Sequence, residues 1–282
     1  KQKLGQYHSV GQLQISVEKY LGHSLGNTAN SVTCEGLGKL DPDKNYLFLC
    51  NHRDIVLDPA ICNMFLHRGG FDTFRIAIGD NLLKRPYSSH LMRLNKSFIV
   101  KRGIENRREK LRELIKLSAY IRKSIQEDAQ SVWIAHKEGR SKDGLDKTDT
   151  ALLKMLNLSG GKELDFSQKS LGLHIVPTVI SYEWDPCDLM KARELTALEK
   201  HGSYDKSEME DINSIATSIQ GQKGDVHVSF GDELDQPFET AEEMADEVDR
   251  QIWSSYKLHA SNLAAYQRQT GALPSSLEID SD

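Results

Sequence analysis

Apolar and polar positions alternate along most of the chain in a way that predicts short strands separated by helices. Runs rich in β-branched and aromatic residues, bounded by turn residues, predict strands at 46–50, 73–78, 97–101, 131–135, 173–182 and 226–230. Apolar residues at helical spacing predict helices at 58–68, 86–94, 105–126, 148–157 and 240–267. Strands that alternate with helices favour an α/β fold, in which a layered mixed sheet is flanked by helices on both faces.

No internal repeat or low-complexity linker divides the chain, so we expect one large domain with additions at its ends. Residues 1–40 are interpreted as a peripheral N-terminal segment, partly helical and leading into a loop. Residues 41–235 are interpreted as the α/β domain, and residues 236–282 as a C-terminal helix and acidic tail that pack on it. Two polar stretches, 158–171 and 198–224, are expected to be long excursions or lids.

The composition indicates a globular protein and excludes several classes. Of the 282 residues, 38% are apolar and 27% are charged, which suffices for a core without disulfides or structural metals. The longest apolar runs fall far short of the ~20 residues of a membrane-spanning helix. Four cysteines, widely spaced and without a CxxC pair, fit a reducing, cytoplasmic compartment. The chain begins at Lys1 rather than Met, which leaves room for a preceding segment with an anchor or targeting signal.

Charge is unevenly distributed along the chain. The net charge of −5 argues against nucleic-acid binding by the whole surface. Between Asn95 and Lys123, however, ten residues are basic and three are acidic, whereas Gly231 to Asp249 holds nine acidic residues and no basic one. Such segments often just solvate a helix face, but the basic one is also suited to dock on an anionic ligand or headgroup.

The junction after the first predicted strand holds the first candidate for chemistry. His52 follows that strand directly, and Asp54 and Asp58 come soon after it. A carboxylate that binds one ring nitrogen of a histidine makes the other nitrogen a better proton acceptor, as a general base for a hydroxyl requires. The competing interpretation is a turn in which Asp54 caps the next helix and His52 only contacts the backbone.

Two further strand ends carry cations that are suited to grip a phosphate or carboxylate. Lys101 and Arg102 end the strand at 97–101, and Arg140 follows the strand at 131–135. Next to Arg140, Gly139 allows a ligand to approach the backbone closely, and Glu138 precedes it. Each signal is weak by itself, since isolated lysines and arginines are mostly solvated surface charges.

In order along the chain, these motifs resemble the glycerolipid acyltransferase family, which includes the glycerol-3-phosphate and 1-acylglycerol-3-phosphate acyltransferases. The family's first block, Asn-His-x4-Asp with a following Pro, is matched at both ends by Asn51-His52 and Asp58-Pro59. The later blocks are matched by Phe98 to Arg102, by Lys137 to Ser141 and by Val176-Pro177. The resemblance covers roughly residues 46 to 182.

Two departures from the family pattern matter. Five residues rather than four separate His52 from Asp58, and the third block lacks its Thr and the preceding Pro. On a regular helix a six-residue step turns about 600°, so the pair requires His52 to lie in the turn before the helix. Asp54 is the competing partner, and we favour Asp58 because its Asp-Pro pair matches the family.

The resemblance implies acyl transfer from acyl-CoA or acyl carrier protein to a glycerol-phosphate hydroxyl, most commonly that of 1-acyl-sn-glycerol 3-phosphate, in phospholipid biosynthesis. It implies His52 and Asp58 as the catalytic pair, and Lys101, Arg102, Glu138, Gly139 and Arg140 as the substrate-binding set. It implies neither a metal nor a cofactor besides the acyl donor, and no nucleic acid partner. Because substrate and product reside in a bilayer, we expect peripheral attachment to the cytoplasmic leaflet through Lys96–Lys123.

Two alternatives remain open. The altered spacing between His52 and Asp58 is compatible with a catalytically inactive relative that binds lipid or phosphate. A remote alternative is a zinc deaminase, because His136 and Glu138 together with Pro186-Cys187 match half of that signature. The position that needs the second cysteine ligand holds Met190.

Overall fold

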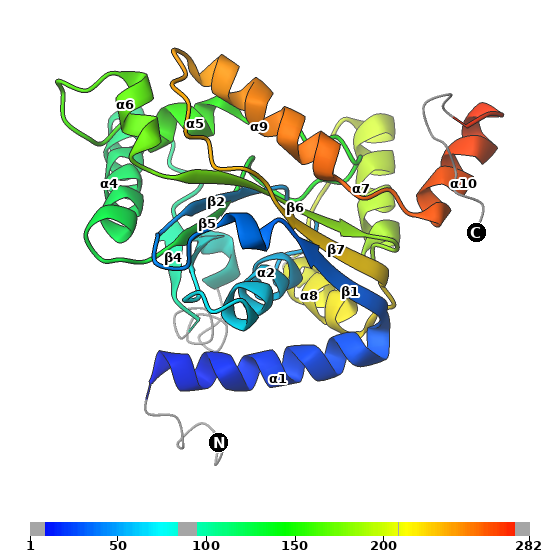
Figure 1. Ribbon diagram of the computed structural model, residues 1–282. Coiled ribbons are helices and arrows are strands. Elements are labelled where there is room, and N and C mark those ends of the chain that lie inside the picture. Colours follow the sequence, from blue (N-terminus) through cyan, green and yellow to red (C-terminus); the bar gives the residue numbers. More distant parts are fainter. Residues whose placement is uncertain (1–8, 84–94, 208, 274–282) are drawn as a thin grey trace.

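A mixed sheet runs through the centre of the molecule, with helices on both faces (Figure 1). The computed structural model describes residues 9–83, 95–207 and 209–273. Within them the strands are β1 (Ala29–Glu35), β2 (Leu47–Cys50), β3 (Arg75–Gly79), β4 (Ser97–Val100), β5 (Val132–Ala135), β6 (Ile175–Tyr182) and β7 (Gly224–Phe230). Their order across the sheet is β1-β7-β6-β2-β5-β3-β4, and neighbours are parallel except β6 and β7. The predicted α/β class is confirmed.

Helices and short 3-10 turns connect the strands. The described helices are α1 (Val10–Thr28), α2 (Leu57–Arg68), α4 (Arg107–Gln126), α5 (Thr150–Leu156), α6 (Phe166–Leu171), α7 (Asp188–His201), α8 (Glu210–Gln220), α9 (Ala241–Ser255) and α10 (Ala260–Thr270). The 3-10 turns are η2 (Leu37–Lys39) and η3 (Asp80–Leu83). None of the helices in the described part of the chain has the length and apolar character that a bilayer crossing requires.

The alternation of side chains along the buried strands divides the core into two clusters, one on each face of the sheet. In β2, Leu47 and Leu49 pack against α4, α5 and α9, whereas Phe48 and Cys50 pack against α1 and α2. All eight residues of β6 are buried, so its entire run of apolar residues lies between the two helix layers. This burial fixes the register of the central strands, and with it the positions of the loops that follow them.

The sequence pattern misplaces two elements. It predicts a loop after the N-terminal helix, but residues 29–35 form the edge strand β1. Most of that strand is exposed and polar, so it lacks the apolar run of a central strand. The pattern also predicts one helix over 240–267, whereas α9 and α10 are separate. The backbone is extended at Tyr256, and His259 begins α10 with a capping box to Asn262. The expected helix at 86–94 lies outside the described residues, and the boundaries at 40 and 235 stay predictions.

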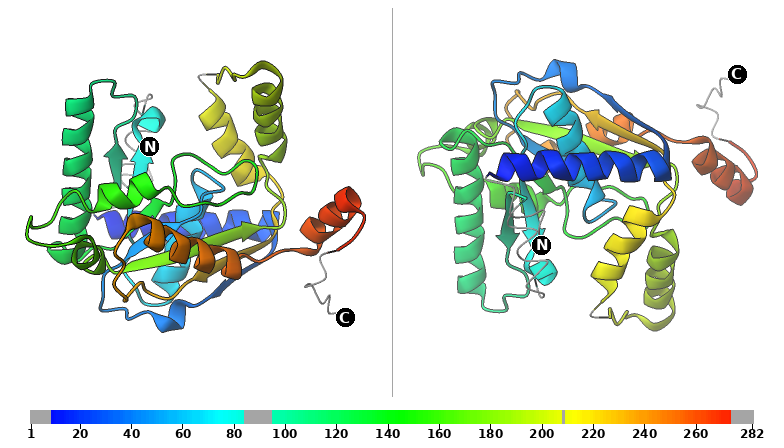
Figure 2. Two further views of the ribbon diagram at one scale, coloured as in Figure 1. Left: turned by 90° about the horizontal axis from the view of Figure 1, so that it is seen from above. Right: turned by 90° about the horizontal axis from the view of Figure 1, so that it is seen from below.

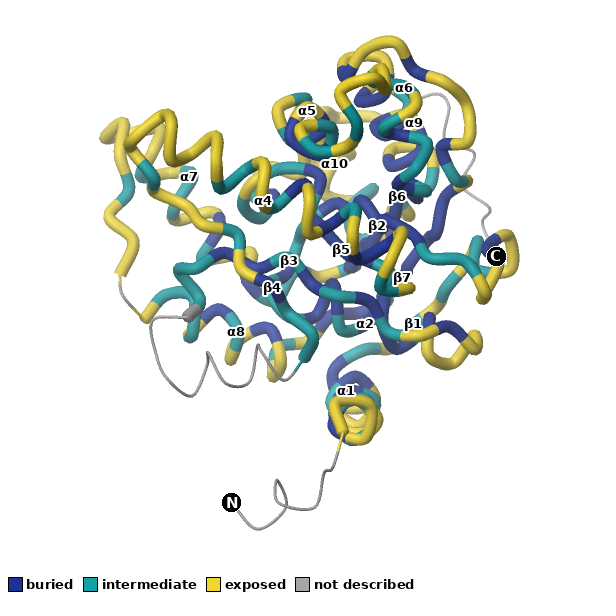
Figure 3. The backbone as a smooth tube through the Cα atoms, turned by 90° about the vertical axis from the view of Figure 1, so that its left-hand side faces the viewer, coloured by how far each residue is buried: buried dark blue, intermediate teal, exposed yellow. Residues whose placement is uncertain are grey.

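The excursion expected at 198–224 contains α8 and the end of α7. These two helices stand side by side at the carboxyl edge of the sheet, with α4 across from them (Figure 2). Helix α7 is largely exposed, in contrast to the buried central strands (Figure 3). The other polar stretch, 158–171, contains α6, which Asp165 begins with a capping box to Gln168.

Candidate active site

The predicted site residues meet at one edge of the sheet. Because β2, β5, β3 and β4 are parallel, their carboxyl ends lie at the same edge. His52 follows β2, Arg102 follows β4 and Glu138 follows β5. Ligands of α/β proteins bind at this edge of the sheet.

His52 and Asp58 form a hydrogen-bonded pair. The Nδ1 atom of His52 lies 2.9 Å from Oδ2 of Asp58, whose side chain is fully buried. The same carboxylate accepts hydrogen bonds from the backbone N–H groups of Arg53 and Asp54, at 2.6 and 2.8 Å, and from the hydroxyl of Tyr182 at 2.9 Å. Since the other three partners are donors, we assign the Nδ1 proton to His52, which leaves its Nε2 atom as a proton acceptor.

Asp54 has different partners. One of its carboxylate oxygens accepts from the backbone N–H groups of Val56 and Leu57 at the start of α2, and the other accepts from the hydroxyl of Ser218. Burial, together with the negative charge of Asp58, raises the pKa of Asp54. The N-cap residue of α2 is Val56, which has no side-chain cap, so Asp54 is not the predicted N-cap but binds the backbone of Val56 and Leu57 where the helix begins. These bonds coexist with the contact between His52 and Asp58.

Backbone and side-chain hydrogen bonds hold the loop that carries His52. The buried Asn51 side chain accepts from the N–H of Ile180 at 2.8 Å and donates to its carbonyl at 3.0 Å, which fastens the end of β2 to β6. The N–H of Ser141 donates to the carbonyl of His52 at 2.7 Å. The ring of Trp133, on β5, lies edge-on to that of His52 with 5.5 Å between centroids. The imidazole is thus positioned from three strands.

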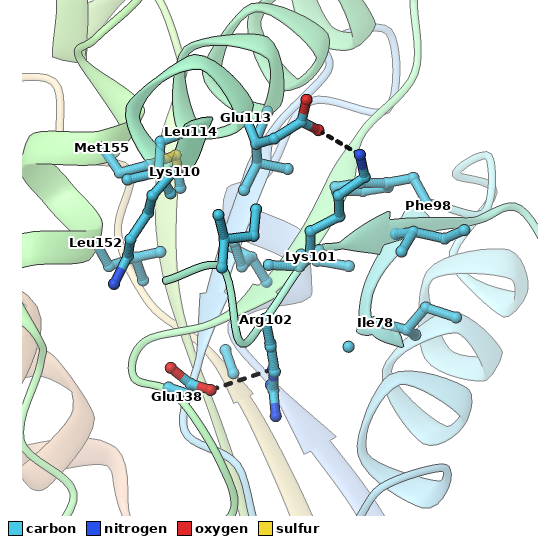
Figure 4. A pocket seen from close by; sticks show the side chains of 18 of the residues that line it. Ile78, Phe98, Lys101, Arg102, Lys110, Glu113, Leu114, Glu138, Leu152 and Met155 are labelled. Atoms are coloured by element: carbon cyan, nitrogen blue, oxygen red, sulfur yellow. Dashed lines mark ion pairs between the residues drawn. The ribbon is translucent and has the colours of Figure 1, made fainter. Parts of the chain in front are cut away.

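Arg102 and Lys101, although adjacent in sequence, point to different sides of the site (Figure 4). The Nε atom of Arg102 pairs with Oε1 of Glu138 at 3.3 Å, whereas Nζ of Lys101 pairs with Glu113 of α4 at 3.0 Å. The guanidinium of Arg102 packs over Gly79 at the end of β3, where a Cβ atom would lie 2.8 Å from Nε. A glycine is therefore needed at position 79 for Arg102 to take this place.

Gly139 and Arg140 lie close to His52. Gly139 has a φ of 79°, in the left-handed region that favours glycine, and a Cβ atom there would meet nothing within 4 Å. The Nη1 atom of Arg140 donates to the hydroxyl of Ser214 in α8 at 2.6 Å. The loop after β5 consequently presents an open backbone and a cation that α8 holds in place.

Two cavities adjoin these residues. A polar one of about 150 Å³ is lined by His52, Arg102, Gly139 and Arg140, among others. A larger one of about 630 Å³ has a mainly apolar lining that includes Phe98, Leu114 and Met155, with Lys101 and Glu138 at its wall (Figure 4). The two share five lining residues, namely Ala77, Ile78, Gly79, Arg102 and Ala135. A polar cavity that contains the candidate base thus shares a wall with an apolar cavity.

Several contacts of the site are not apparent from the sequence. Tyr182 ends β6 and contacts Asp58 from a position 124 residues away in the chain. Burial and the charge of Asp58 raise the pKa of this tyrosine well above its usual value, so its hydroxyl stays protonated and donates. Asp146 holds the side chains of Arg53 and Asn51, the latter at 3.3 Å. No local pattern marks either residue, since each acts through a contact distant in sequence.

The residues of the half deaminase signature have other contacts. His136 is buried beside Thr148, and the sulfur of Cys187 lies 3.2 Å from the hydroxyls of Ser214 and Ser218. Over the described ranges, no three His, Cys, Asp or Glu side chains gather as a metal site would need.

Comparison with known proteins identifies the family. A crystal structure of a 1-acyl-sn-glycerophosphate (LPA) acyltransferase, PlsC, from Thermotoga maritima is similar over 89% of this chain and 83% of that chain, with 15% identity and a TM-score of 0.48. No curated protein matches. The family model named Acyltransferase matches residues 31–181, which is more than half of the 282 residues and includes the pair of His52 and Asp58. The family recognised from the sequence motifs is confirmed: this chain belongs to the Acyltransferase family.

Proposed function

We propose that this protein transfers a fatty acyl group from acyl-CoA or acyl carrier protein to the hydroxyl of a glycerol-phosphate acceptor. The observation that supports it best is the pair of His52 and a buried Asp58 beside a cavity lined by Arg102 and Arg140. Such a cavity suits an anionic phosphate next to a hydroxyl that must lose a proton. We propose 1-acyl-sn-glycerol 3-phosphate as the acceptor, a choice that rests on the family resemblance.

In this mechanism the Nε2 atom of His52 removes the proton from the acceptor hydroxyl. At the same time the oxygen of that hydroxyl attacks the thioester carbonyl of the donor. The carbon–sulfur bond then breaks, and the thiolate leaves and takes the proton from the imidazolium. Asp58 stabilises the imidazolium and keeps Nδ1 turned toward itself, as the contact of 2.9 Å allows. No covalent acyl-enzyme is formed. Proton transfer of this kind contributes typically 10²–10⁴-fold to a rate.

The other proposed substrate-binding residues divide between the two cavities. Arg102 and Arg140 would hold the acceptor phosphate, with Gly139 allowing it to approach the backbone. Glu138 keeps Arg102 in place through their ion pair. Lys101 lines only the apolar cavity, so we propose that it stays at the mouth of the acyl site. That cavity, about 630 Å³ in volume, is within the range of small-molecule pockets and would receive the acyl chain.

We also propose that the protein attaches peripherally to the cytoplasmic leaflet of a membrane. The exposed part of α4 supports this, because Leu111 and Ile115 are exposed there beside Arg107, Arg108 and Lys110. Apolar side chains flanked by cations suit an anionic bilayer surface. The four free thiols fit the reducing environment of the cytoplasm.

The test is to incubate the purified protein with acyl-CoA or acyl carrier protein donors and with glycerol 3-phosphate or 1-acylglycerol 3-phosphate, and then to identify the product. His52→Ala should abolish transfer and leave the melting temperature nearly unchanged. His67→Ala is the matched control, since His67 also pairs with a carboxylate, Glu18 at 2.7 Å, but lines neither of the two cavities described above.

Each outcome separates the proposal from its alternatives. A folded His52→Ala protein with full activity would overturn the mechanism. A wild-type protein that binds 1-acylglycerol 3-phosphate but transfers nothing from any donor would support the inactive relative instead. Stoichiometric zinc in the purified protein would support the zinc deaminase interpretation instead.

A further inference from the structure

Helices α7 and α8 form part of the wall around His52, although they lie outside the residues that the family model matches. Glu194 of α7, Asp211 of α8 and Lys206 of the segment between them line the polar cavity. We call α7, α8 and the segment between them the α7–α8 wall. The family match ends at residue 181, before α7 begins at Asp188, so this wall is an addition to the matched core.

The α7–α8 wall is fastened to the loop that carries His52. The Nζ atom of Lys191 in α7 donates to the carbonyl of Arg53 at 2.9 Å, and the hydroxyl of Ser218 in α8 donates to Asp54. Both Lys191 and Asp54 are buried. Arg53 and Asp54 directly follow His52, so the wall has a defined place relative to the candidate base.

Two lysines at the cavity are held by acids of the wall. Lys206 Nζ lies 2.5 Å from Oδ1 of Asp211, and the other oxygen of Asp211 accepts from Asn81 Nδ2 at 3.1 Å. Lys142, which follows the third family block, pairs with Glu194. With Arg102 and Arg140 the cavity has four cationic side chains. Among the described residues, Arg140 is the one of these four without a carboxylate partner, since Arg102 pairs with Glu138.

Each of these lysines retains donor capacity. An ammonium group has three donors, and within the described residues Nζ of Lys206 and Nζ of Lys142 each contact one carboxylate. Their side chains are 45% and 31% exposed, so neither is sealed away from the cavity. A phosphate monoester carries up to two negative charges and a phosphodiester carries one, so each of these cations attracts the monoester more strongly.

We propose that Lys142 and Lys206 bind the acceptor phosphate and that the α7–α8 wall thereby selects a phosphate monoester over a phosphodiester. This inference rests on the proposed function, and it adds an acceptor-selecting role for an element outside the matched core. The wall contains Lys206 itself, and it contains Glu194, which orients Lys142. A charge-assisted contact to a dianion is stronger than one to a monoanion, so the loss of a lysine should affect the monoester more.

The experiment compares Lys206→Gln with Lys200→Gln, and Lys142→Gln with Lys147→Gln. The two control lysines are exposed and line neither the polar nor the apolar cavity. Lys200 lies in the last turn of α7, shortly before Lys206, and Lys147 lies in the same loop as Lys142. We expect each cavity variant to raise KM for 1-acylglycerol 3-phosphate about tenfold, the loss of one charge-assisted hydrogen bond, with kcat nearly unchanged. For the phosphodiester lysophosphatidylglycerol, KM should change by less than about threefold.

A binding measurement keeps this inference separate from the reaction. In the His52→Ala background, Lys206→Gln should weaken the Kd of sn-glycerol 3-phosphate about tenfold relative to Lys200→Gln, whether or not the wild type transfers acyl groups. Equal KM and Kd values for cavity and control variants would overturn the role of the lysines. Equal losses on monoester and diester acceptors would overturn the selectivity. Absence of transfer in the wild type, with the binding difference intact, would overturn only the proposed reaction.

Discussion

The loop after β2 and the loop after β4 end at the same edge of the sheet, but their side chains are held very differently. Asp58 is 0% exposed and His52 15%, and four donors converge on the Asp58 carboxylate. Lys101 and Arg102 are 54% and 38% exposed, and each pairs with one acid. The first loop is fixed by buried hydrogen bonds, both within the loop and to Tyr182, whereas the second keeps exposed partners that a ligand can replace.

This difference suits the two chemical tasks that we propose for the loops. A proton acceptor must already be aligned when the substrate arrives, and buried hydrogen bonds supply that alignment at no cost to each turnover. A group that binds an anionic ligand gains from remaining partly hydrated with an exchangeable ion pair, because a buried unpaired charge is costly. The following predictions test whether the two loops divide the work in this way.

The largest expected effect concerns the carboxylate pair. Asp58→Asn should lower kcat about 10²–10⁴-fold, because an amide no longer stabilises the imidazolium. Asp54→Asn should lower kcat less than about tenfold, since the amide oxygen of asparagine can accept the same backbone hydrogen bonds from Val56 and Leu57. Steady-state rates with one acceptor, alongside melting temperatures, make the comparison. The reverse order would reassign the partner of His52, and small equal effects would support an inactive relative.

The second prediction concerns α4, which follows the exposed loop. Replacing Arg107, Arg108 and Lys110 by Gln should weaken binding to anionic vesicles about a hundredfold, given roughly 1 kcal/mol for each cation near the surface. Co-sedimentation with vesicles of graded phosphatidylserine content measures it. Replacing three cations elsewhere, Lys154, Lys162 and Lys169, is the control.

For α4, wild-type binding should also decline as salt is added, because the attraction is screened within a Debye length of ~10 Å at 0.1 M salt. Binding that is insensitive to salt would point to apolar insertion. Absence of binding at every lipid composition would contradict the proposed attachment to a membrane.

The third prediction separates Arg102 from Lys101. Arg102 lines both cavities and Lys101 only the apolar one. Arg102→Ala should therefore raise KM for the phosphate acceptor about tenfold to a hundredfold, the loss of a bidentate cation. Lys101→Ala should change that KM less than about threefold, as for an exposed ion pair. If Lys101→Ala has the larger effect, the phosphate binds on the α4 side instead.

The same contrast explains what could be predicted from the sequence. The buried strands were predictable because short continuous apolar runs such as that of β6 are typical of strands that are covered on both faces. The pairing of His52 with Asp58 could be inferred because both lie within seven residues of chain. In contrast, β1 has one strand neighbour and no apolar run. The contact of Tyr182 with Asp58, and the position of Lys206 at the same cavity as His52, arise only when distant segments fold together.

The last and smallest effect concerns a second histidine at the same edge, His136, which resembles His52 in sequence position but not in surroundings. It is fully buried, and its Nδ1 atom lies 3.2 Å from the hydroxyl of Thr148, which itself donates to Asp249 at 2.6 Å. The hydroxyl therefore accepts a hydrogen bond from the Nδ1–H group of His136. Burial, together with electrostatic interactions with Lys137, His52 and Arg53, lowers the pKa of His136 to about 3.

Because this pKa is lower in the folded than in the unfolded chain, the unfolded state binds the extra proton, and stability is lost as pH falls below about 6.5. Between pH 7.5 and 5.5 the loss due to His136 should be about 1.4 kcal/mol, a tenfold change in the unfolding constant. His136→Gln, which cannot be protonated, should remove that part of the pH dependence whatever its stability at pH 7.5. Urea unfolding of both proteins at the two pH values gives the difference directly. If the loss on acidification is the same in both, His136 is not the buried neutral group described here, and the contrast with His52 at this edge fails.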